Sequence, residues 1–141
     1  MTGIISFFVE GRPAPQGSKR YVGRGRMVES SRHLKPWRHD IRNEAEANQM
    51  AFAGCDLAYD GPVRLRLEFV MLRPKATPKT RTPPAVKRPD LDKLTRAVFD
   101  GITGTLITDD SQVVDLQATK RIANIDEPCG VHITLRIEPT P

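Results

Sequence analysis

Four aspartates lie in two short stretches of the chain and are its clearest candidates for chemistry. Asp90 and Asp92 stand at the start of a helical pattern, and Asp109 and Asp110 follow as a pair beyond it. The chain has three histidines and two cysteines, and they form no zinc-type motif. Clustered carboxylates repel one another unless a cation neutralises them, so these hard oxygen ligands favour Mg²⁺, with Mn²⁺ as a substitute. Each aspartate alone also has a structural interpretation, as a helix cap or a turn residue.

The helical pattern determines which of these side chains can meet. Asp90 is a good N-cap candidate, and from that position its carboxylate can converge with that of Asp92. Further along, Asp92, Arg96 and Asp100 follow one another at intervals of four residues and therefore share one helix face. The paired aspartates lie only about a helix length downstream, so their turn can return to the start of this helix.

The charge of the chain is strongly segregated around a net value of +5. Residues 12–42 hold nine basic and two acidic residues, residues 73–88 hold six basic residues and no acid, and the remainder has a net charge of −8. Two basic segments on an acidic scaffold favour a polyanionic partner, although a basic face that serves only solubility is the alternative. Beside a Mg²⁺ site, they point to metal-assisted phosphodiester chemistry.

The candidate DNA-contacting residues belong to these two segments. They are Lys19, Arg20, Arg24, Arg26, Lys75, Lys79, Arg81, Lys87 and Arg88. We expect them to contact mainly the phosphate backbone, which positions a duplex without reading its sequence. Selectivity would then come from the shape and deformability of the DNA.

Hydrophobic spacing predicts the elements that must position these residues. Strands are expected over 4–10, 63–72, 113–123 and 131–138, a hairpin with strands over 19–23 and 26–30, and helices over 36–53 and 90–103. Residues 73–88 contain four prolines and no aliphatic pattern, which predicts a mobile loop that orders against a partner. This order is typical of a single α+β domain over 1–141.

Length and composition exclude several classes of protein. A chain of 141 residues is enough for one domain, and its hydrophobic fraction of 38% is too high for a disordered protein. No segment approaches the roughly 20 apolar residues that span a bilayer, and the N-terminus does not resemble a secretory signal. We therefore expect a cytoplasmic protein with no membrane partner and with both cysteines reduced.

The aspartate-rich stretch resembles the signature of RusA-type Holliday-junction resolvases, which are small phage- and prophage-associated endonucleases. The resemblance rests on Pro89-Asp90-Leu-Asp92-Lys-Leu-x-Arg96-x-x-x-Asp100, then Ile107-x-Asp109-Asp110-x-Gln112-Val113, and a downstream Lys120. It covers about 35 residues, and the order of elements and the basic N-terminal half fit the rest of the chain.

The resemblance implies a Mg²⁺-dependent homodimer that cuts a four-way DNA junction by paired symmetric nicks, in the cytoplasm of a bacterium or of a phage host. It implies a small mixed β-sheet with two main helices. It also implies that Asp90, Asp92 and Asp110 form the metal site. We expect Asp109 to act as an orienting group next to them and Lys120 to help stabilise the phosphate. A two-fold protein matches a two-fold substrate that needs two cuts.

The chain departs from the family pattern at two positions. Lys93 stands where the family usually has Asn, and Arg96 stands where it usually has a catalytically important Lys. Arginine keeps the positive charge but is a poor proton donor, because its pKa lies far above neutral pH. We hypothesise that Lys93 or Arg96 supplies the electrostatic role at the phosphate.

Two alternatives use the same residues differently. The departures at Lys93 and Arg96 also suit a non-catalytic DNA- or RNA-binding protein that keeps a RusA-like fold. A purely structural basic protein, in which the aspartates serve only as caps and turns, is the third interpretation.

Overall fold

The alternation of apolar and charged residues along strand β4 (Val63–Met71) determines the two faces of the sheet. In the computed structural model, which describes residues 3–17, 19–29 and 32–138, Leu65, Leu67 and Phe69 are at most 2% exposed, whereas Arg64 and Arg66 are exposed. Successive side chains of a strand point to opposite faces, so one face carries the core and the other faces solvent. The predicted half-buried strand is confirmed.

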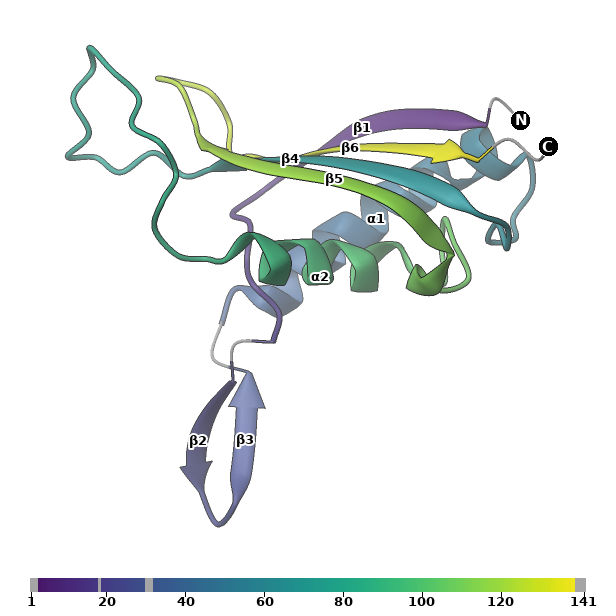
Figure 1. The fold of residues 1–141 in the computed structure, drawn as a ribbon, viewed down its shortest axis with the longest axis horizontal. Helices are drawn as coiled ribbons and strands as arrows, with labels where there is room; N and C mark the ends of the chain where they lie inside the picture. The colour runs from purple at the N-terminus through teal and green to yellow at the C-terminus, as the bar shows by residue number, and fades with distance from the viewer. Residues whose placement is uncertain (1–2, 18, 30–31, 139–141) are drawn as a thin grey trace.

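Four strands form one mixed sheet in the order β1-β6-β4-β5 (Figure 1). Strand β1 (Ile4–Glu10) pairs antiparallel with β6 (Gly130–Ile137), which pairs antiparallel with β4. Strand β5 (Val113–Ile122) runs parallel to β4 at the sheet edge. The parallel pair requires a crossover, and the chain makes it through a long loop and helix α2 (Leu91–Ile102). The predicted α+β class is confirmed.

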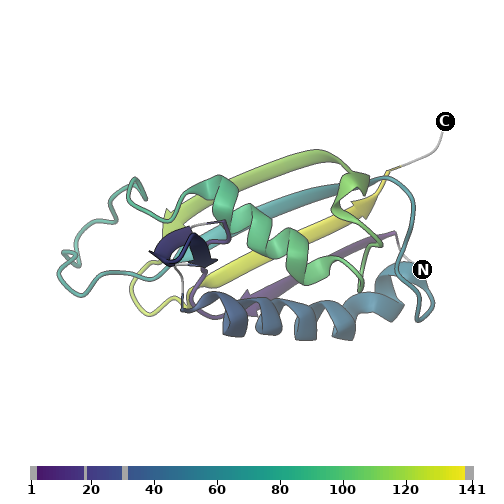
Figure 2. The same ribbon diagram turned by 90° about the horizontal axis from the view of Figure 1, so that it is seen from below.

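Helices α1 (Leu34–Ala53) and α2 cover the same face of the sheet, as Figures 1 and 2 show. Their buried side chains include Trp37, Ile41, Ala45 and Phe52 from α1 and Leu94, Ala97, Val98 and Ile102 from α2. The helices approach closely at Gly101, where an added Cβ would lie 2.5 Å from Cγ2 of Ile41. A side chain at this position would push the site-bearing helix away from α1.

Helix α1 begins two residues earlier than predicted. The sequence suggests a start at Pro36, but the helix includes Leu34 and Lys35 and its N-cap is His33. Proline is tolerated in the first turn because the backbone N–H groups there have no partner within the helix. The predicted end at Gly54 is confirmed, since this glycine is left-handed with φ 76° and its N–H donates to the Met50 carbonyl.

The hairpin forms a separate two-stranded sheet that projects from the body of the molecule (Figure 1). Its strands are β2 (Lys19–Gly23) and β3 (Arg26–Glu29), and Arg24 and Gly25 make the turn with positive φ values of 50° and 71°. The predicted final residue of the second strand, Ser30, lies outside the described residues. In the part of the chain that the structure describes, no helix has both the length and the apolar character to cross a membrane.

Candidate active site

A cavity of about 1180 Å³ lies between α2, strand β5 and the connector that follows β1. We call it the aspartate cavity. Its charged lining residues are Asp92, Lys93, Arg96, Asp100 and Asp110. Leu116 and Ala118 contribute its wall on β5, and Gln16 and Gly17 contribute its wall on the connector. Two segments of the predicted signature therefore meet across one open cavity.

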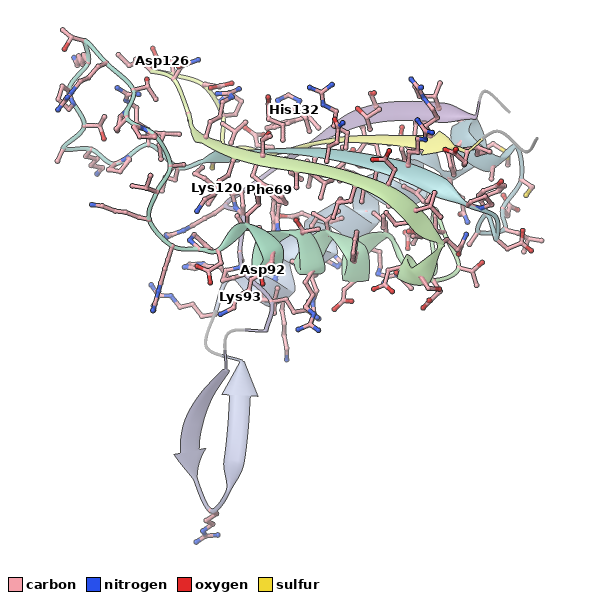
Figure 3. The ribbon with its side chains drawn as sticks, in the orientation of Figure 1. Phe69, Asp92, Lys93, Lys120, Asp126 and His132 are labelled. Atoms are coloured by element: carbon pink, nitrogen blue, oxygen red, sulfur yellow. The ribbon has the colours of Figure 1, made fainter. Side chains whose placement is uncertain are left out.

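One face of α2 supplies most of these groups. Asp92, Arg96 and Asp100 line the cavity together, which confirms the prediction that this spacing places them on one helix face. Figure 3 shows Asp92 and Lys93 at the N-terminal end of α2. Since the N-terminus of a helix carries a partial positive charge, the Asp92 carboxylate is favoured there and so is an incoming phosphate.

Asp90 occupies the predicted N-cap of α2 but is placed differently from the other two proposed ligands. Its backbone is extended, its side chain makes no capping hydrogen bond, and it is not among the residues that line the aspartate cavity. The carboxylate lies 3.9 Å from the Lys93 ammonium, and 57% of the side chain is exposed. The structure thus brings Asp92 and Asp110 to one cavity, and the convergence of Asp90 with them stays a prediction.

The Asp109-Asp110 pair divides into a structural and a cavity-facing member. Asp109 is the N-cap of the short 3₁₀ helix η1 (Asp110–Gln112), and its carboxylate accepts hydrogen bonds from the hydroxyl and backbone N–H of Ser111. These bonds lower the pKa of Asp109 below its ordinary value. Asp109 therefore shapes the turn, and this turn presents Asp110 to the cavity.

Gln112 fastens this turn to the rest of the protein. Its side-chain oxygen accepts from the Asp109 N–H at 2.7 Å, and its amide donates to the carbonyls of Tyr59 at 2.7 Å and Gly61 at 2.8 Å. Gln112 belongs to the motif that begins at Ile107, but the sequence alone assigns it no function. The structure assigns it the positioning of Asp110.

Replacing Gln112 by Ala is expected to lower the free energy of unfolding by about 1–3 kcal/mol, because it removes the donor to the part-buried Gly61 carbonyl and the acceptor of the Asp109 N–H. The Tyr59 carbonyl loses one donor but keeps the Thr108 N–H. Urea unfolding measures this effect. Gln117→Ala removes an exposed glutamine from β5 and should change stability by less than about 0.5 kcal/mol. Equal effects of the two substitutions would contradict the role of Gln112.

A second network, centred on Asp100, joins the connector to α2. The Gln16 amide donates to the Asp100 carboxylate, and Arg38 donates to the Gln16 side-chain oxygen at 3.2 Å and lies 3.7 Å from Asp100. The Gln16 backbone N–H also donates to the Lys93 carbonyl at 3.0 Å. Sequence reasoning missed Gln16, because nothing within the connector indicates a partner 84 residues away.

The next residue, Gly17, permits a close contact with Arg96. An added Cβ at Gly17 would lie 3.0 Å from Nη1 of Arg96, and its φ of +95° is one that favours glycine. The Arg96 guanidinium therefore lies against the connector just before the hairpin begins. This contact links the catalytic candidate on α2 to the base of the projecting hairpin.

The basic loop between β4 and α2 has internal order around Arg73. The Arg73 guanidinium donates to the carbonyls of Pro78 and Arg81 at 2.7 Å and to that of Ala123 at 3.1 Å. Lys75, Lys79 and Arg81 are exposed on this loop, as a phosphate-contacting role requires. Whether the loop is mobile before DNA binds stays a prediction.

Lys120 holds the end of this loop. Its ammonium donates to the carbonyl of Lys87 at 2.9 Å and to that of Pro89 at 2.8 Å, so it fixes the backbone just before Asp90. Lys87 and Arg88 themselves are exposed. Lys120 therefore positions the start of α2 as well as being a predicted DNA contact.

The hairpin carries the remaining candidate DNA contacts. Arg24 is exposed at its turn, at the far end from the body. The side chains of Lys19, Arg20 and Arg26 lie outside the described part of the structure. A projecting two-stranded ribbon has dimensions that the major groove of DNA admits.

The donor set of the aspartate cavity fits Mg²⁺. Asp92 and Asp110 supply hard carboxylate oxygens, and Mg²⁺ is commonly held by one or two carboxylates together with waters and substrate phosphates. Among residues 3–17, 19–29 and 32–138, no group of three or more His, Cys, Asp or Glu is arranged to hold a metal. The two carboxylates therefore suit an Mg²⁺ ion whose other ligands would be waters and substrate phosphate oxygens.

Comparison with known proteins agrees with the signature. Residues 10–136 match the family described as Endodeoxyribonuclease RusA, and this range contains both the aspartate cavity and the two basic segments. None of the curated proteins compared with the chain matches it. The match covers most of the chain and assigns to it DNA endonuclease activity on branched junctions in general terms. The chain belongs to the RusA family of endodeoxyribonucleases.

Proposed function

We propose that this chain is a Mg²⁺-dependent, structure-selective endonuclease that resolves four-way DNA junctions by paired symmetric nicks in recombination and repair. One observation carries the proposal: within a family of endodeoxyribonucleases, the chain lines a single open cavity with Asp92 and Asp110 beside Lys93 and Arg96. Carboxylates for a metal and cations for a phosphate are the two requirements of phosphodiester hydrolysis.

In the proposed mechanism, the carboxylates of the aspartate cavity bind the metal and its basic residues bind the phosphate. Asp92 and Asp110 would hold the Mg²⁺, with Asp90 as the third family ligand. When bound, the ion supplies an activated water and neutralises charge that develops on the scissile phosphate. Lys93 and Arg96 orient the phosphate oxygens and stabilise their added negative charge from the helix side.

Selection of a junction would come from the basic surfaces around the cavity and from symmetry. The loop and the hairpin carry cations that contact the backbone, so they position DNA without reading its sequence. We propose a homodimer, because a junction with two-fold symmetry needs one cut in each of two strands.

A plasmid that extrudes a cruciform tests this proposal. Paired nicks made within one binding event across the junction linearise the plasmid, whereas a single nick gives only an open circle. We expect linear product that depends on Mg²⁺ and disappears when the inverted repeat is deleted. Open circles alone, or equal cutting of the plasmid without the repeat, would overturn paired, structure-selective cleavage.

The double substitution of Lys93 and Arg96 by Ala is expected to lower junction cleavage about a hundredfold, because it removes both cations from the lining of the aspartate cavity, where they would stabilise the phosphate. Arg66 and Arg136 are exposed on the other face of the sheet, so replacing both by Ala is a charge-matched control. Single-turnover cleavage measures both variants, and the two single substitutions show which cation dominates. Full activity of the Lys93/Arg96 double variant would defeat this assignment.

A binding protein without nuclease activity is the second candidate. The substitutions at the two family positions favour it, as does the position of Asp90 outside the lining of the aspartate cavity. This candidate predicts tight, salt-sensitive DNA or RNA binding and no cleavage at any Mg²⁺ concentration.

A further inference from the structure

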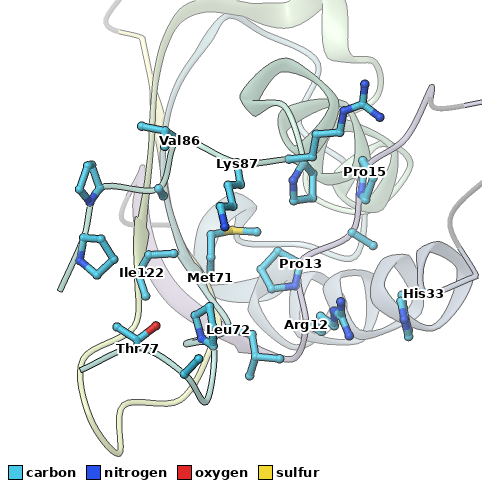
Figure 4. A pocket seen from close by; sticks show the side chains of 18 of the residues that line it. Arg12, Pro13, Pro15, His33, Met71, Leu72, Thr77, Val86, Lys87 and Ile122 are labelled. Atoms are coloured by element: carbon cyan, nitrogen blue, oxygen red, sulfur yellow. The ribbon is translucent and has the colours of Figure 1, made fainter. Parts of the chain in front are cut away.

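A second cavity, of about 640 Å³, lies on the other side of the connector that borders the aspartate cavity. We call it the proline-lined cavity. It is formed by residues 12–15 on one side and by the end of β4 and the loop after it on the other, with Ile122 of β5 between them (Figure 4). Its lining includes seven proline rings together with Met71, Leu72 and Val86. Pockets of roughly 300–1,000 Å³ hold small organic ligands.

The walls of this cavity are largely apolar, and the charged residues among them are all basic. Arg12, Arg81, Lys87 and Arg88 line it with His33, and no aspartate or glutamate is among the lining residues. In Figure 4 the Lys87 side chain extends from the loop into the cavity. This combination suits a ligand that has a flat apolar part and a phosphate, because proline rings pack against a base and cations pair with the anion.

The two cavities are bounded by the same two segments. On the connector, Pro13 and Pro15 line the proline-lined cavity, and the next residues, Gln16 and Gly17, line the aspartate cavity. On the loop, the lining ends at Pro89, two residues before Leu91 joins the wall of the aspartate cavity. A nucleic-acid strand lying across the boundary would therefore reach both.

Hydrogen bonds within the protein join the loop to itself and to the edge of the sheet. Arg73 binds the carbonyls of Pro78 and Arg81, and Lys120 binds those of Lys87 and Pro89. Several cavity walls are thus tied to the edge of the sheet or to one another. These contacts lower the number of groups that must become ordered when a small group binds, which favours its capture.

We propose that the proline-lined cavity holds one unstacked nucleotide of the DNA junction, with its base against the proline and aliphatic walls and a phosphate toward Lys87 and Arg88. This inference rests on the proposed function and specifies where the substrate strand lies next to the cut. Removing a base from the stack costs less where continuous stacking is already interrupted, as it is where the arms of a junction meet. The cavity would thus favour branched over continuous duplex DNA.

A junction that carries a single 2-aminopurine at successive positions around the branch point tests this proposal, because its fluorescence rises when the base leaves the stack. Binding is measured without Mg²⁺, so that no cleavage is needed for the readout. Ala76→Trp fills the cavity from an exposed loop position, and Thr80→Trp places the same side chain on the same loop outside the lining. Junction affinity is measured in parallel by mobility shift.

We expect wild type and Thr80→Trp to raise the fluorescence several-fold at one position, and Ala76→Trp to bind the junction without that rise. An unchanged rise with Ala76→Trp, or no rise at any position with wild type, would overturn the proposal. If Ala76→Trp changed the protein from a dimer to a monomer but left the 2-aminopurine fluorescence rise unchanged, the occupant of the cavity would be a protein segment instead. Failure of the proposed function looks different, because the wild-type protein would then leave the junction uncut in Mg²⁺ whatever the fluorescence shows.

Discussion

Replacing Asp92 by Asn is expected to lower junction cleavage at least about a hundredfold while junction binding changes little. Asn keeps the size of the side chain but removes the negative charge that holds Mg²⁺, and Asp92 is exposed, so the fold should tolerate the change. Single-turnover cleavage in Mg²⁺ and binding without metal separate the two effects. Asp110→Asn should behave in the same way, because both carboxylates line the aspartate cavity.

Asp126→Asn is the matched control for these substitutions. Asp126 is exposed in the turn between β5 and β6, far from α2 in Figure 3, and asparagine also tolerates its positive φ of 63°. Its cleavage rate should equal that of the wild type. A wild-type rate for Asp92→Asn, or an equal loss for Asp126→Asn, would contradict the assignment of the aspartate cavity as the metal site.

The same series decides the role of Asp90. If Asp90 is a third ligand in the DNA-bound enzyme, Asp90→Asn should match the loss seen with Asp92→Asn. If its main role is the contact with the Lys93 ammonium, which is 3.9 Å away, the loss should be smaller. The exposed contact itself contributes at most about 1 kcal/mol, so a large loss would indicate metal binding.

Replacing Phe69 by Ala is expected to lower the free energy of unfolding by about 3–5 kcal/mol. Phe69 is fully buried on the helix-covered face of β4, where it belongs to the core cluster that joins the sheet to α1 and α2. Its loss removes apolar contact and leaves a cavity under the helix that carries Asp92. Urea unfolding followed by far-UV circular dichroism measures the change.

Leu57→Ala provides the comparison for Phe69→Ala. Leu57 is 74% exposed after α1, so truncating it should change stability by less than about 0.5 kcal/mol. A loss below 1 kcal/mol for Phe69→Ala would mean that β4 does not have the central place that the structure gives it.

The local pattern of the sequence was sufficient for most of the fold. The alternation in β4 and the spacing of Leu94, Val98 and Ile102 in α2 predict both elements and their buried faces, because these periods depend only on neighbouring residues. The same local rule placed Asp92, Arg96 and Asp100 on one face. The first turn of α1 was missed, where proline is compatible with the helix, and so was the short 3₁₀ helix η1.

Contacts between distant segments could not be predicted in this way. Gln16 meets Asp100, Lys120 meets the carbonyls of Lys87 and Pro89, and Gln112 meets Tyr59 and Gly61 across the tertiary structure. Sequence spacing limits which face a residue occupies but not its rotamer or its partner from another element. For the same reason, the sequence could not predict that Asp90 lies outside the lining of the aspartate cavity.

The most direct test incubates the protein with an end-labelled four-way junction and a linear duplex of matched sequence, each with and without Mg²⁺. We expect symmetric nicks near the branch point of the junction alone, only with Mg²⁺, and none with Asp92→Asn. Tight junction binding with no cleavage in Mg²⁺, or equal cutting of the linear duplex, would contradict this expectation.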